Sequence, residues 1–67
     1  MIDIEDLKNN FINGNLENGI YTSGVNKIVK VGSNGFSINT LQNNGWTRIN
    51  IYEYIDQQWI ESETYEK

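Results

Sequence analysis

The longest alternating segment of the chain runs from Trp46 to Ile55 and predicts a β-strand. One set of alternate positions holds Ile49, Ile51 and Ile55, and the other set is aromatic and polar. Successive side chains of a strand point to opposite faces of a sheet, so this segment predicts one aliphatic face and one aromatic-polar face. We expect it to be a central strand that buries its aliphatic face.

Shorter alternating segments predict further strands, which are separated by turn residues. The expected strands span residues 20–22, 25–31, 36–41, 46–55 and 59–65. Asn-Gly pairs, which favour tight turns, begin at Asn13, Asn18, Asn34 and Asn44 and coincide with predicted turns or with a helix end. Short strands joined by such turns typically pair with their chain neighbours, so the pattern predicts an antiparallel meander.

The N-terminal segment has helical spacing instead. Ile4, Leu7 and Phe11 form an apolar stripe, and Asp3 is a favoured N-cap residue. This spacing predicts a helix over residues 3–13, which is too short to be stable unless it packs on the sheet. The expected fold is one α+β domain over residues 1–67, in two layers, with the helix on an antiparallel meander of three to five strands. The expected core between the layers is Leu7, Phe11, Val29, Val31, Phe36, Ile38, Ile49, Ile51 and Ile55.

Composition removes several kinds of site. The 67 residues include no Cys and no His, which excludes disulfides and Cys/His metal sites. Asp3, Glu5 and Asp6 stand together at the helix start, where capping and the helix dipole explain them without a metal ion. We therefore expect no cofactor and no metal.

Catalysis is not expected either. Without His, a nucleophile needs a carboxylate or an amine as its base, and so small a chain lacks the walls of a closed pocket. The acid–base candidates Glu53, Asp56, Glu61 and Glu63 are interpreted as a solvated acidic edge, with Glu53 expected beside Glu61 and Glu63.

Charge bears on the partner and on the compartment. The net charge is −4, so direct binding of nucleic acid, which requires clustered Lys and Arg, is not expected as the main role. No apolar run is long enough to span a membrane, and no basic-then-apolar leader opens the chain. These features predict a cytoplasmic protein, located in the host-cell cytosol if a phage encodes it.

The aromatic-polar face supplies the candidate binding residues, because aromatic side chains and Arg are enriched at binding hot spots. We expect this face to point away from the helix and to bind a partner. The predicted partner-binding residues are Trp46, Arg48, Tyr52, Tyr54, Trp59, Glu61, Glu63 and Tyr65. An acidic and aromatic surface suits a basic protein better than a phosphate backbone. The structural alternative is that the aromatic residues pack on one another or on a second copy.

Three functions remain open at this point. The first is a small acidic, non-catalytic interaction protein that binds a larger basic nucleic-acid-handling protein and places carboxylates where phosphates would lie. In size, acidity and lack of cofactor ligands the chain is similar in kind to phage- or mobile-element-encoded inhibitors, including anti-CRISPR proteins, although no motif places it in any family. The second is a homo-oligomeric structural or assembly protein, such as a homodimer. The third is a single-stranded nucleic-acid binder, in which aromatic residues would stack on bases beside a basic groove.

Overall fold

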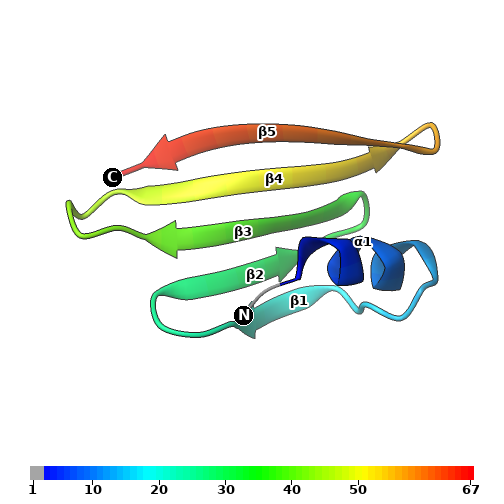
Figure 1. Ribbon diagram of the computed structural model, residues 1–67, viewed down its shortest axis with the longest axis horizontal. Helices are drawn as coiled ribbons and strands as arrows, with labels where there is room; N and C mark the ends of the chain where they lie inside the picture. Colours follow the sequence, from blue (N-terminus) through cyan, green and yellow to red (C-terminus); the bar gives the residue numbers. More distant parts are fainter. Residues whose placement is uncertain (1–2) are drawn as a thin grey trace.

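A computed structural model describes residues 3–67, which form one helix and five strands. The elements are α1 (Ile4–Ile12), β1 (Gly19–Thr22), β2 (Lys27–Val31), β3 (Gly35–Leu41), β4 (Thr47–Ile55) and β5 (Gln58–Glu66). The strands make one antiparallel sheet in the order β1-β2-β3-β4-β5, so each lies beside its neighbours in the chain (Figure 1). The predicted α+β class and the antiparallel sheet are confirmed.

Helix α1 is defined by its caps. The Asp3 carboxylate accepts hydrogen bonds from the backbone N–H groups of Glu5 at 3.0 Å and Asp6 at 3.3 Å, which satisfies two donors that the first turn leaves free. At the other end Asn13 is the C-cap, and Gly14 follows at a φ of 74°, where a residue without a Cβ is favoured. Within residues 3–67 no helix is long and apolar enough to cross a membrane.

The core lies on one face of the sheet. Val29, Val31, Phe36 and Ile38 are each at most 6% exposed. They share a face because Val29 pairs with Ile38 and Val31 with Phe36 across the β2–β3 ladder. We call this face the core face. The partly buried side chains that pack against this cluster are Ile4, Leu7, Phe11, Leu16, Tyr52 and Trp59.

The face predicted for the isoleucines of β4 is wrong. Tyr52 pairs with Phe36, and their rings stack at 5.1 Å, so alternation places Tyr52 on the core face. Ile49, Ile51 and Ile55 therefore lie on the opposite face, which we call the isoleucine face, and they are not part of the core cluster. Alternation separates the two faces of a strand but does not show which face is buried. A shift of the pairing register by one residue exchanges the two faces.

The β1–β2 and β4–β5 connections differ from the expected ones in position or length. Strand β2 begins at Lys27 instead of residue 25, because Gly24 and Asn26 have φ values of 86° and 60° and form the preceding turn. The β4–β5 connection has two residues, Asp56 and Gln57, at φ values of 52° and 64°. Two left-handed residues are typical of a type I′ hairpin turn, whose twist suits the flanking strands and fixes their register.

Gly35 is the point of closest approach between β3 and β4. It pairs with Glu53, and a Cβ built on Gly35 would fall on the backbone carbonyl oxygen of Tyr52. By contrast, a Cβ at Gly32 meets nothing within 4 Å. Glycine at position 35 therefore allows the β2–β3 hairpin to lie directly against β4.

Candidate protein-binding surface

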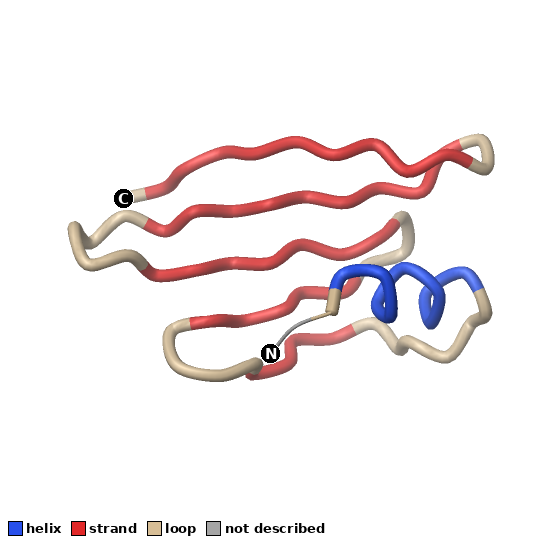
Figure 2. Tube along the Cα trace, viewed as in Figure 1, coloured by secondary structure: helices blue, strands red, loops and turns tan. Residues whose placement is uncertain are grey.

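The register of β4 with β5 places the predicted binding residues on the core face. Arg48 lies beside Tyr65, Tyr52 beside Glu61, and Tyr54 beside Trp59. Glu63 shares this face through the alternation of β5, and Trp46 lies directly before the start of β4. Helix α1 lies at one end of the sheet and leaves the opposite end uncovered (Figure 2). The residues consequently fall into a packed group and an open group.

The packed group consists of Tyr52, Tyr54 and Trp59. The ring of Trp59 lies 5.0 Å from that of Tyr54, 5.7 Å from Phe36 and 5.6 Å from Phe11 of α1, all between ring centroids. Edge and tilted contacts at such distances are favourable arrangements for aromatic pairs. The expectation that these aromatics point away from the helix is wrong, because they join α1 to the core cluster.

Lys8 of α1 is held at the border between the two groups. Its side chain is 14% exposed, and its Nζ lies 3.6 Å from the Glu5 carboxylate and 3.4 Å from the Glu61 carboxylate. The same ammonium is 5.6 Å from the centroid of the Tyr52 ring and 5.7 Å from that of Trp59, within cation–π range. Lys8 thus neutralises part of the acidic charge and orients Glu61, whose own side chain remains 62% exposed.

Glu63 is the best-oriented carboxylate of the open group. One of its oxygens accepts a hydrogen bond from the Asn50 side-chain amide at 3.0 Å, and the other accepts one from the Tyr65 hydroxyl at 3.1 Å. The hydrogen bond to Glu63 is the main cause that raises the pKa of Tyr65 above its ordinary value; burial and the Glu63 charge act in the same direction, and the Arg48 charge acts against them. Tyr65 therefore stays neutral at physiological pH and continues to donate to Glu63, which fixes a negative charge on the surface.

Trp46 and Arg48 complete the open group. Trp46 is 38% exposed and Tyr65 is 47% exposed, and the Lys67 ammonium lies 5.8 Å from the centroid of the Trp46 ring. Within residues 3–67 the Nε of Arg48 is buried and has no hydrogen-bond partner. We call this open group the β5 patch, which consists of Trp46, Arg48, Glu61, Glu63 and Tyr65.

The expected grouping of Glu53 with Glu61 and Glu63 is wrong. Glu53 pairs with Ile60 and lies on the isoleucine face, because it stands an odd number of positions from Tyr52. Asp56 belongs to the β4–β5 turn. Among residues 3–67 no group of three or more carboxylates is placed to share a metal ion.

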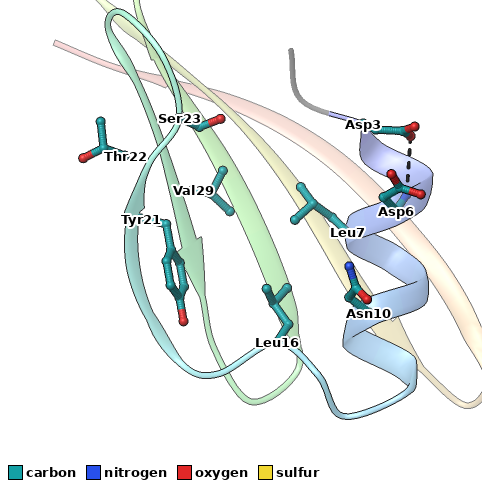
Figure 3. Close-up of a pocket in the computed structure, with 9 residues that line it drawn as sticks. All are labelled: Asp3, Asp6, Leu7, Asn10, Leu16, Tyr21, Thr22, Ser23 and Val29. Atoms are coloured by element: carbon teal, nitrogen blue, oxygen red, sulfur yellow. Dashed lines mark hydrogen bonds between the residues drawn. The ribbon is translucent and has the colours of Figure 1, made fainter.

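A separate groove lies between α1 and β1 (Figure 3). It has a volume of about 390 Å³ and is lined by Asp3, Asp6, Leu7, Asn10, Leu16, Tyr21, Thr22, Ser23 and Val29. Asp3 already serves as the helix cap, and the apolar side chains at its base belong to the packing around the core. The groove is therefore the seam between α1 and β1.

Lys8 and Asn50, which contact the carboxylates of Glu61 and Glu63, are positions that sequence reasoning did not single out. Asn50 was accessible in principle, because a two-residue turn at Asp56 and Gln57 sets the register that places Asn50 beside Glu63. The expected strands, 46–55 and 59–65, instead leave a turn of three residues, 56–58, and that turn pairs β4 with β5 in a different register. Lys8 had no sequence signal, since its partners on β4 and β5 are more than forty positions away along the chain.

Comparison with known proteins gives no relative. No protein-family model matches the chain, and no curated protein or solved structure is significantly similar to it.

Proposed function

We propose that this chain is a small acidic, non-catalytic interaction protein that uses the β5 patch to bind a basic surface on a larger nucleic-acid-handling protein. The proposal includes a two-layer arrangement in which α1 packs on the core face and leaves the β5 patch free. The contact between Phe11 and Trp59 and the ion pair between Lys8 and Glu61 support that arrangement. Binding would prevent the larger protein from engaging nucleic acid, as phage-type inhibitors including anti-CRISPR proteins do.

The observation that carries the proposal is the oriented pair Glu61 and Glu63. Both carboxylates lie on one face of β5, two residues apart, which is about 7 Å along a strand. Both are held in place by neighbours, Glu61 by Lys8 and Glu63 by Asn50 and Tyr65. A row of fixed negative charges is complementary to the Lys and Arg side chains that a nucleic-acid-binding channel presents to phosphates.

The aromatic members of the patch suit the same partner. Trp46 and Tyr65 are partly exposed next to Arg48. Their rings can stack on the guanidinium groups of Arg side chains of the partner. Aromatic residues that are rigid and half-buried contribute contact area at a small cost in conformational entropy. We expect the carboxylates to set the rate and the specificity of association, and the rings to slow dissociation.

The edge position of β5 extends this surface. Within residues 3–67 strand β5 is paired only with β4, so its other side presents nine residues of backbone that can accept a strand from a partner. Two β5 strands pairing with each other antiparallel would bring Glu61 and Glu63 of the two copies close together, which like charges disfavour. A basic strand avoids that repulsion, so charge favours a basic partner over self-pairing at this edge.

The test uses the full chain as bait in a lysate of the host cell, which is the cell that the encoding phage infects or that carries the encoding mobile element. Wild type is compared with the double variant Glu61→Gln and Glu63→Gln, which keeps side-chain shape and removes two charges. We expect wild type to retain a basic nucleic-acid-binding protein in a salt-sensitive manner, and the double variant to lose it. An oligonucleotide substrate of the captured protein should then compete with wild type for binding.

The matched control is Asp6→Asn with Glu17→Gln, which removes the same charge outside the β5 patch and leaves the Lys8 ion pairs in place. This variant should retain the partner. Equal retention by both double variants would show that net acidity alone drives binding, and retention of no basic protein by wild type would contradict the proposal.

A further inference from the structure

The isoleucine face has no covering element within residues 3–67. Helix α1 packs its side chains against the core face, and the remaining elements are the strands themselves. The aliphatic side chains on the isoleucine face are half-buried or exposed: Ile20, Ile28, Leu41, Ile49, Ile51, Ile55 and Ile60. Ile28 and Ile49 flank Asn39 in one row across three strands, and Ile51 lies in the next row beside Ser37. This face therefore presents aliphatic side chains of β2 and β4 on either side of two small polar residues of β3, Ser37 and Asn39.

We propose that this face is the interface of a homodimer, in which the sheets of two copies pack face to face. The proposal is independent of the function proposed for the β5 patch, because that patch lies on the other face and stays exposed in the dimer. Each dimer would then present two acidic patches on its outer sides.

Charge distinguishes a second copy from a basic partner at this face. The charged strand residues on this face are Lys30, Glu53 and Glu66, whereas Lys27, Arg48, Glu61 and Glu63 lie on the core face. Glu53 and Glu66 stand near opposite ends of the β4–β5 ladder, so this face has no cluster of carboxylates to attract a basic protein. Two copies of a chain with a net charge of −4 repel each other least when they meet through the face that carries few charges.

The charges on this face are also self-complementary. Consider a two-fold axis that runs parallel to the strands, over β3 and midway between the two sheets, so that β2 of one copy lies over β4 of the other. Lys30 is level with Ile51 across the sheet, and Glu53 follows Ile51 by two positions on the same face. In this arrangement the Lys30 side chain can reach the carboxylate of the partner subunit's Glu53. The two-fold axis repeats this ion pair, so the interface contains it twice.

The available area is in the range that a stable dimer needs. The chain measures 36 × 21 × 18 Å, so its broad face has a footprint of about 750 Å². Interfaces of standard size bury about 800 Å² on each partner. Only four hydrophobic side chains among residues 3–67 are buried in one chain, so stacking a second sheet would supply the second layer of core that a β-sandwich has.

The test is the mass of the full chain in solution, measured by light scattering and sedimentation across micromolar concentrations. We expect wild type to have twice the 7.8 kDa of one chain. Ile49→Lys places an unpaired charge in the middle of the interface and should raise the dissociation constant at least about tenfold. The control Ile12→Lys changes an isoleucine of α1 that is 47% exposed, and it should remain a dimer.

Further variants on this face keep the test decisive if Ile49→Lys does not fold. Ile28→Lys, at a residue that is 40% exposed, should weaken the dimer in the same way while the far-UV circular dichroism stays unchanged. For the charge pair, Lys30→Glu and Glu53→Lys should each weaken the dimer, and the double variant should restore it. A wild-type chain of monomeric mass, a dimer unaffected by Ile28→Lys, or additive weakening in the charge-swapped variant would overturn the proposal.

Discussion

Phe36 should be the residue on which the stability of the fold depends most strongly. It is 3% exposed on β3 and belongs to the four-residue core cluster. Its ring stacks on Tyr52 at 5.1 Å and meets the edge of Trp59 at 5.7 Å. Truncation of a buried Phe to Ala costs about 3–5 kcal/mol, from the lost burial and the cavity that remains. A domain of 67 residues has a total stability of about 3–10 kcal/mol, so Phe36→Ala should largely unfold the chain.

Phe36→Leu gives a variant whose stability can be measured. Leucine keeps most of the buried apolar area but loses both ring contacts, each of which contributes about 0.5–1.5 kcal/mol, so we expect a loss of about 1–3 kcal/mol. The assay is urea unfolding at fixed protein concentration, followed by circular dichroism and by the fluorescence of Trp59, which lies against the substituted ring.

The matched control is Tyr65→Leu, because Tyr65 is on the same face but 47% exposed. Replacement of this aromatic residue should change the free energy of unfolding by no more than about 0.5 kcal/mol. If Tyr65→Leu were as destabilising as Phe36→Leu, or if Phe36→Leu had no effect, the assignment of the core to the face that carries Phe36 would be refuted.

Three further variants test the caps, the turns and the surface charge. Asp3→Ala should lower stability by about 0.5–2 kcal/mol in urea unfolding, because two first-turn N–H groups lose their acceptor, and Asp3→Ser should retain most of it. Gly35→Ala should cost about 1–3 kcal/mol in the same assay because the new Cβ meets backbone of β4, and Gly32→Ala should be close to neutral. Glu63→Gln should lower the pKa of Tyr65 in an ultraviolet titration of the phenol, since the hydrogen bond to the carboxylate is the main cause of the raised pKa. The sign follows from that raised value: the contribution of the hydrogen bond to stability is present below the ordinary tyrosine pKa and is lost as pH rises through the folded-state pKa.

Much of the local structure follows from local chemistry. The Asn-Gly pair that begins at Asn13 ends α1, and the pair that begins at Asn44 lies in the turn before β4, with Gly14 and Gly45 at φ values of 74° and 87°. Asp3 caps the helix as its position predicts. These features depend on backbone conformations that one or two residues favour by themselves, so they are accessible without knowledge of the rest of the chain.

The candidate site was predicted less completely. Alternation correctly grouped the aromatic and polar residues of β4 on one face, but their division into a packed and an open group depends on where α1 ends. Trp59 is packed because Phe11 reaches it, whereas Tyr65 is open because no helix covers its end of β5. Contacts between residues so far apart in sequence have no signature in the periodicity of either segment.

The sequence by itself determined the succession of one helix and five strands, because helical and alternating periods and turn residues act over a few positions. The tertiary structure decided which face of the sheet is buried. Isoleucines and aromatic rings are both apolar, so transfer from water favours burying either set. The outcome depends on shape: the rings of Tyr52 and Trp59 fit against Phe36 and Phe11, whose positions are set by the strand register and by the path of α1. The isoleucines were left on the outside by that fit, and their exposure is a property of the folded chain alone.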